Sequence, residues 1–92
     1  MQYTLVWTSG FTRAAGKFLK QHPDLREKFA AILGDLERDP FQPHLRYHHL
    51  GGQLKGVQAI SITSSYRLTL SLVIADHEIN LLDVGSHDEV YR

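Results

Sequence analysis

The chain has 92 residues, of which 42% are hydrophobic and 22% charged. This composition is typical of a soluble globular protein and excludes a disordered or low-complexity chain. The absence of cysteine excludes disulfides and thiolate metal sites, and no apolar run approaches the ~20 residues of a membrane-spanning helix. Ten basic residues balance ten acidic ones, unlike the charge of a strongly basic nucleic-acid-binding protein. We therefore expect a single domain over residues 1–92, with no membrane partner.

The charges are distributed unevenly along the chain. Residues 40–67 contain three basic side chains, Arg46, Lys55 and Arg67, together with three His and no acidic residue. This segregation predicts a local positive face on a neutral protein, although chance in a short chain would give the same pattern. Charge alone leaves these two interpretations open.

The first segment predicts a strand followed by a helix. Residues 2–8 alternate and are rich in side chains that favour strands. Ser9 is a suitable N-cap for a helix over about residues 10–22, and Pro23 ends that helix. One face of this helix is apolar: Phe11, Ala14, Ala15, Phe18 and Leu19.

A second helix over about residues 25–38 completes a helical hairpin. Asp24 and Glu27 match a capping box, and residues 39–40 end the helix. Residues 40–52, with two Pro, two Gly and three His, are expected to form a polar loop that carries function. The apolar face of the helix comprises Leu25, Phe29, Ile32, Leu33 and Leu36.

Three strands are predicted in the second half, over residues 53–63, 66–75 and about 78–85. Leu82 and Val84 are expected to point inward from the last strand. The order β-α-α-β-β-β predicts an α+β fold in which the helical hairpin packs on one face of a small antiparallel sheet. In the middle strand, Leu68, Leu70, Leu72 and Ile74 point toward the helices. The opposite, polar face displays Ser61, Thr63, Arg67 and Thr69.

Three motifs follow one another in this half of the chain. They are HHLGGQLKG at residues 48–56, SSYRL at residues 64–68 and VGSHDEVY at residues 84–91. In this order after a helical hairpin, they resemble the RelE/ParE toxin superfamily, and within it the RelE and YafQ-like branch of mRNA-cleaving toxins. The resemblance implies the toxin of a type II toxin–antitoxin system. It also implies a metal-independent endoribonuclease without a cofactor, which cleaves mRNA at the ribosome by attack of the 2′-hydroxyl.

The resemblance implies catalytic roles for His48, Arg67, His87 and Tyr91. Histidine suits proton transfer because its pKa lies near working pH. We expect His48 to act as the general base and His87 as the general acid, with the two roles exchangeable. Arg67 is expected to stabilise the charge of the phosphorane, and Tyr91 to stack on a base or to donate its hydroxyl.

A second group of polar residues is expected to bind RNA. Arg46 and Lys55 would hold phosphates that flank the cleaved bond. Ser61 and Ser65 depart from the family pattern, because YafQ-like toxins carry His and Asp at these positions. The lysines that RelE carries around residues 58–60 are also absent. The RNA-binding set is Arg46, His49, Lys55, Ser61 and Ser65.

Simpler structural roles remain open for the same residues. Arg67 could form a cross-strand ion pair with Asp83, His87 could pair with Asp88, and Tyr91 could cover the sheet edge.

The other His residues point less clearly to function. His44 and His48 have metal-like spacing without a third ligand, so we expect no metal site. His22 and His77 are expected to be surface residues.

The resemblance leaves two further functions open. One is a ParE-like toxin that inhibits DNA gyrase without catalysis, and the other is a degenerate toxin that only binds its antitoxin. The expected partners are a cognate antitoxin with a segment that folds on binding, mRNA and the ribosome, and operator DNA only through the antitoxin. The resemblance also implies the cytoplasm of a prokaryote.

Overall fold

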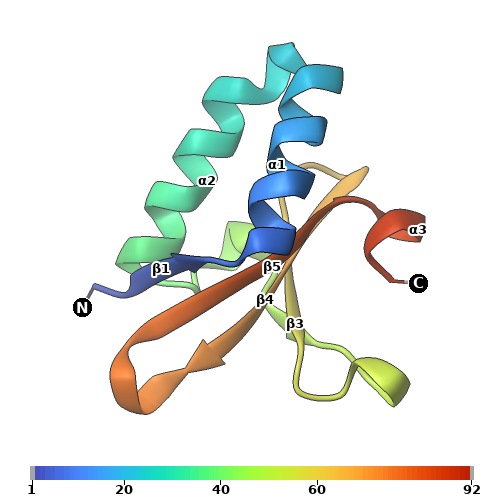
Figure 1. Cartoon of the computed structure of the whole chain (residues 1–92). Helices are drawn as coiled ribbons and strands as arrows, with labels where there is room; N and C mark the ends of the chain where they lie inside the picture. The colour runs from blue at the N-terminus through green and yellow to red at the C-terminus, as the bar shows by residue number, and fades with distance from the viewer. Residues whose placement is uncertain (1, 92) are drawn as a thin grey trace.

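The computed structural model describes residues 2–91 as a five-stranded sheet with two helices packed on one side (Figure 1). The order of the helices and strands along the chain confirms the predicted α+β fold. No helix within these residues is long and apolar enough to cross a membrane. The helices and strands are β1 (Thr4–Trp7), α1 (Ser9–Gln21), α2 (Arg26–Arg38), β2 (His48–His49), β3 (Gln58–Ser61), β4 (Tyr66–Val73), β5 (Glu78–Ser86) and α3 (His87–Val90). Four single-turn 3-10 segments connect them: η1 (Pro23–Leu25), η2 (Pro43–Leu45), η3 (Gly52–Leu54) and η4 (Ile74–Asp76).

The strands have the order β1-β5-β4-β3-β2. The three predicted strands β3, β4 and β5 pair antiparallel, as expected, and the additional strand β2 pairs antiparallel with β3, whereas β1 pairs parallel with β5. The parallel pairing arises because the chain returns through the helical hairpin and three further strands before β5 is placed beside β1. The two-residue strand β2 lies within the segment predicted to be a loop.

The core lies between the two long helices and the apolar face of the sheet. Phe11 and Phe18 of α1 both pack on Phe29 of α2, with ring centroids 6.2 and 6.0 Å apart. Burial of each such side chain contributes about 1.5–3 kcal/mol to the free energy of unfolding. The sheet contributes the fully buried residues Ile60, Leu68, Leu70, Ile79 and Leu81.

Both predicted helix starts are wrong in detail. The N-cap of α1 is Thr8 rather than Ser9, because the Thr8 hydroxyl accepts a hydrogen bond from the N–H of Phe11 at 3.1 Å. The predicted capping box at Asp24 and Glu27 does not form. The chain first makes the 3-10 turn η1, so that α2 begins later, without a side-chain cap.

For one of the two residues predicted to point inward from the last strand, the prediction is also wrong. A register shift between Thr69 and Leu70 interrupts the alternation along β5. In consequence Leu81, rather than Leu82, pairs with Leu70 in the core, whereas Val84 is buried as predicted.

The predicted ends of two strands also change. Ile74 leaves β4 for the turn η4 and is 67% exposed. The strand predicted over residues 53–63 is shortened to Gln58–Ser61, because Gly52–Leu54 form the turn η3.

Candidate functional site

The face of the sheet away from the helices carries Arg67 and His48. Arg67 pairs with Ser61 across β3 and β4, and His48 pairs with Ala59 across β2 and β3. Paired residues project to the same face, and so do residues two apart on one strand. Ser61 and Arg67 therefore share the polar face, as the sequence predicts, and His48, expected in a loop, lies on the same face through β2.

The Arg67 guanidinium is held by the turn that precedes its own strand. Its Nη1 donates to the carbonyl oxygens of Thr63, Ser64 and Tyr66 at 2.9, 3.2 and 3.3 Å. Within residues 2–91, neither Nε nor Nη2 has a hydrogen bond to the protein. The alternative ion pair with Asp83 does not form, because Asp83 lies opposite Thr69 and accepts from the N–H of Val84 at 2.8 Å. The guanidinium therefore keeps donors for a ligand such as phosphate.

A pocket of about 430 Å³ lies beside this turn. Among the described residues that line it, none is a carboxylate and the charged groups are all basic, which indicates an anion as its ligand. The sequence assigned His44 no role beyond its metal-like spacing, and its place in this pocket was not predicted. The one signal in the sequence is that His44 belongs to the acid-free segment 40–67. The packing of η2 against β3, which brings His44 to the pocket, leaves no local pattern. The pocket is lined by His44, Arg46, Ser61, Ile62, Thr63, Ser64 and Arg67.

His48 and its neighbour His49 face opposite sides of the sheet, since side chains alternate along a strand. His48 Nδ1 lies 2.9 Å from the carbonyl oxygen of Arg46, so that Nδ1 must carry the hydrogen. In the neutral ring, Nε2 is then free to accept a proton. His49 instead contacts the Tyr47 ring, with centroids 5.6 Å apart, and the Gln58 amide at 3.5 Å. The structure thus does not bring His49 to the Arg67 pocket.

His87 and Tyr91 are positioned by α3. A capping box holds this helix, in which Ser86 and Glu89 exchange hydrogen bonds. The His87 and Tyr91 rings meet edge to face with centroids 4.3 Å apart. The contact between His87 Nδ1 and Asp88 is 3.7 Å long and both side chains are exposed, so it holds the ring weakly. The Tyr91 hydroxyl is buried and has no hydrogen-bond partner within residues 2–91, and a bound group could satisfy it.

Three polar residues of the predicted RNA-binding group have different surroundings. Arg46 is exposed with a left-handed φ of 55° at the end of η2, where it lines the pocket. Lys55 and Ser65 are exposed in loops and do not line it.

Gln58, at a position where RelE-like toxins are basic, is buried and accepts from the N–H of Leu72 at 3.1 Å. Its role is therefore structural.

Two ionisable groups near the site have shifted pKa values. The hydrogen bond from His44 lowers the pKa of Asp35 below its usual 3.8, against the opposing effect of burial, and the hydrogen bond from Arg38 adds to the lowering. Burial raises the pKa of Tyr47 above 10.0, and the nearby Tyr3 adds to this effect. Within residues 2–91, no group of three His, Asp or Glu residues could hold a metal ion.

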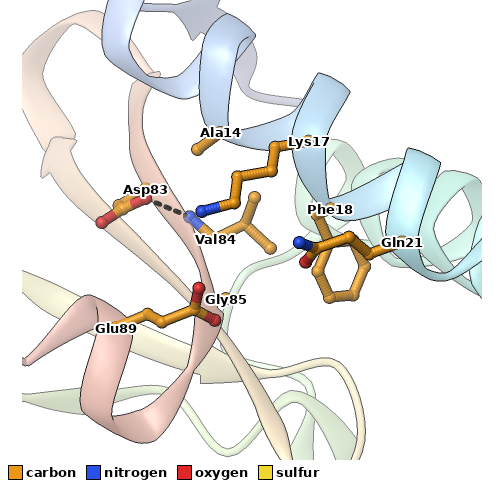
Figure 2. Close-up of a pocket in the computed structure, with 8 residues that line it drawn as sticks. All are labelled: Ala14, Lys17, Phe18, Gln21, Asp83, Val84, Gly85 and Glu89. Carbon is orange, nitrogen blue, oxygen red and sulfur yellow. Dashed lines mark hydrogen bonds between the residues drawn. The ribbon is translucent and has the colours of Figure 1, made fainter.

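A second pocket lies between α1 and the end of β5, where β1 no longer covers the strand edge (Figure 2). The Lys17 side chain extends along this edge toward Val84, with Asp83 and Glu89 on either side. The Asp83 and Glu89 carboxylates accept from the backbone N–H groups of Val84 and Ser86 at 2.8 Å each. They thereby cap the exposed strand edge. None of the residues predicted to function lines this pocket.

The sequence matches no family model and no curated protein, whereas the fold matches solved structures over almost its whole length. YafQ from E. coli strain BL21(DE3) is 17% identical with a TM-score of 0.82, covering 99% of this chain and 100% of that chain. A YoeB/ParE toxin from Agrobacterium tumefaciens is 19% identical with a TM-score of 0.75, covering 91% and 98%.

A toxin–antitoxin complex also matches. The E. coli DinJ–YafQ complex contains a chain that is 18% identical with a TM-score of 0.80, and the match covers 100% of both chains. Identities this low show the fold alone, and a fold does not by itself define an activity. The chain has the fold of the RelE/ParE superfamily of toxins.

Proposed function

We propose that this protein is the toxin of a toxin–antitoxin pair and that it cleaves mRNA at the polar face of its sheet. The observation that supports this most directly is the anchored Arg67, which keeps free donors on the same face as His48. The fold shared with YafQ and with the toxin of the DinJ–YafQ complex supports the toxin class.

The proposed reaction needs no metal. His48 removes the proton of a 2′-hydroxyl, and the resulting oxygen attacks the adjacent phosphorus. The bond from phosphorus to the 5′-oxygen breaks, and His87 gives a proton to that oxygen. The products are a 2′,3′-cyclic phosphate and a 5′-hydroxyl. Arg67 stabilises the negative charge that develops on the phosphorane oxygens, and each proton transfer contributes about 10²–10⁴-fold to the rate.

The hydrogen bond of His48 supports its assignment as the base. Its Nδ1–H is engaged by the carbonyl of Arg46, which leaves Nε2 as the acceptor. His87 follows the end of β5, and β4 and β3 separate it from β2. Arg67 on β4 thus lies between the strand that carries His48 and the strand that His87 follows. The RNA would therefore run across the strands, with Arg67 between the two histidines.

Most of the remaining predicted residues fit contacts along an RNA strand. Arg46 and Ser61 line the Arg67 pocket and would bind the backbone there. Ser65 and Lys55 lie outside it and would contact only more distant nucleotides. His49 faces the other side of the sheet, so it takes no part in this RNA path. Tyr91 would stack on a base. In a cell the protein would be held inactive by a cognate antitoxin and would meet mRNA at the ribosome, while operator DNA would be bound only through the antitoxin.

The test is cleavage of a defined mRNA by the purified protein, with and without translating ribosomes. We expect new ends within codons, with a 2′,3′-cyclic phosphate on the upstream fragment. The Arg67→Lys variant keeps the charge but loses the planar fork, and we expect its rate to fall at least 10²-fold. Arg26→Lys, an exposed substitution on α2, is the matched control. Intact mRNA under both conditions would contradict the proposal and would favour gyrase inhibition or antitoxin binding alone.

A further inference from the structure

A hydrogen-bonded pair of side chains beside the Arg67 pocket has no part in the reaction described above. His44 Nε2 lies 2.8 Å from Asp35 Oδ2. An ionised carboxylate only accepts hydrogen bonds, so that Nε2 carries the hydrogen and Nδ1 is left for another group. A carboxylate that fixes the tautomer and orientation of an imidazole in this way is a recurrent device in functional sites.

The segment that carries His44 is fixed at several points. The Gln42 amide donates to the carbonyl oxygens of Asp35 and Asp39, at 2.9 and 3.0 Å, which ties the segment to the end of α2. Leu45, the residue after His44, is fully buried in the core. His44 is therefore held against the pocket from both sides, even though its own side chain is half exposed.

The charges around His44 favour an anion in the pocket. Asp35 is the nearest acidic group, and it already forms an ion pair with Arg38. On the pocket side, His44 is accompanied by Arg46 and Arg67. The negative charge of Asp35 is thus balanced on α2, and the pocket itself is lined only by basic and uncharged groups.

We propose that this pocket binds a backbone phosphate of the RNA and that His44, as the imidazolium, donates to this phosphate from Nδ1 while Nε2 donates to Asp35. Asp35 acts as the positioning residue for His44. Phosphate oxygens accept short hydrogen bonds from imidazolium and guanidinium groups, and such bonds are stronger than neutral ones. This inference rests on the proposed function, because it takes RNA as the ligand.

The test is binding of a fluorescent 2′-fluoro RNA hexanucleotide, which lacks the attacking hydroxyl and cannot be cleaved. At pH 6, we expect the Kd of His44→Asn to be about tenfold higher than that of the wild type, because one hydrogen bond to a charged group is lost. His77→Asn is the matched control: His77 is exposed in the turn at the other end of β4, and we expect its Kd to be unchanged.

The role of Asp35 has its own measurement. Ring 15N spectra at pH 8 should show His44 as the Nε2–H tautomer in the wild type and in Asp35→Asn, whose amide oxygen still accepts the hydrogen bond. In Asp35→Ala the tautomers should mix and binding should weaken as in His44→Asn. Circular dichroism provides the control for folding. A variant that has a native spectrum but mixed tautomers has lost the Asp35 contact and not the fold.

The outcomes separate this inference from the proposed function. If His44→Asn binds as tightly as the wild type while Arg67→Ala loses binding, the His44 contact is refuted and the RNA site stands. Failure of the wild type to bind the hexanucleotide would overturn both. Weaker binding by His44→Asn, with an unchanged His77→Asn, would support the contact.

Discussion

Arg67 illustrates how single residues of this protein are held for chemistry. Three backbone carbonyls fix one end of its guanidinium, so that little rotamer freedom remains to be lost when a ligand binds. His48 is restrained in the same manner by the carbonyl of Arg46. In the part of the chain that the structure describes, His87 is restrained only by the Tyr91 ring and a long contact with Asp88. The acid is therefore the least fixed of the three groups.

His87→Ala should separate catalysis from stability. His87 lies past the last core strand and its side chain is 68% exposed, so we expect the free energy of unfolding to change by less than about 0.5 kcal/mol. Loss of the proposed acid should lower the rate of RNA cleavage at least about 10²-fold. Urea unfolding and single-turnover cleavage measure the two quantities. Cleavage at the wild-type rate would show that His87 is not the acid.

The Asp35–His44 contact predicts a pH effect on folding. A carboxyl pKa that is lower in the folded than in the unfolded chain stabilises the fold above the unfolded value, about 3.8. This contribution is lost as the pH falls through the folded pKa. In His44→Asn we expect the Asp35 pKa to rise toward 3.8, which a 13C NMR titration of the carboxyl would measure. An Asp35 pKa identical to that of the wild type would show that His44 is not the cause.

At the scale of elements, Thr8 joins three of them. It directly follows β1 and caps α1, and its hydroxyl donates to the carbonyl of Leu81 on β5 at 2.7 Å. Thr8→Ala should lower the free energy of unfolding by about 1–2 kcal/mol. Thr12→Ala, which removes an exposed hydroxyl from the same helix, should stay within about 0.5 kcal/mol. Equal effects of the two substitutions in urea unfolding would contradict this role of Thr8.

The position of α3 depends on a glycine. A Cβ at Gly85 would lie 2.9 Å from Glu89 Oε1, which can swing away, and 3.1 Å from Glu89 Cβ, a contact tight enough that Glu89 must move. Gly85→Ala should therefore displace α3, and with it His87 and Tyr91, at a cost of about 1–3 kcal/mol. We expect the rate of RNA cleavage to fall by more than the decrease in the folded fraction of the protein would explain. Gly16→Ala on the exposed side of α1 meets no atom within 4 Å and should stabilise by about 0.5–1 kcal/mol. Full activity of folded Gly85→Ala would contradict the role of α3.

Periodicity predicted the elements more accurately than it predicted their ends. The apolar faces of α1 and α2 are buried as expected, because amphipathic spacing alone determines which side of a helix meets the core. The bulge beside Thr69, and hence the burial of Leu81, depends on how two strands fit together. The choice of Thr8 over Ser9 as a cap likewise depends on the contact of Thr8 with β5. Neither kind of contact leaves a local pattern in the sequence.

At the scale of the whole molecule, the predicted chain order and fold are confirmed, and the sheet places Arg67 and His48 on one face. The sequence could indicate these residues through their motifs. It could not indicate the pairing of His44 with Asp35, because nine positions separate them and only the packing of η2 against α2 brings them together. The catalytic and RNA-binding roles of the site residues stay predictions, which measurements of RNA cleavage by the variants test.

The most direct measurement is primer extension on cellular transcripts after induced expression, comparing the wild type with the Arg67→Ala/His87→Ala double variant. Both substituted side chains lie outside the buried core, so the double variant should accumulate as a folded protein. We predict new transcript ends within translated codons for the wild type only. Growth arrest with intact transcripts in the wild type, or identical cuts in both strains, would contradict cleavage of RNA at this face of the sheet.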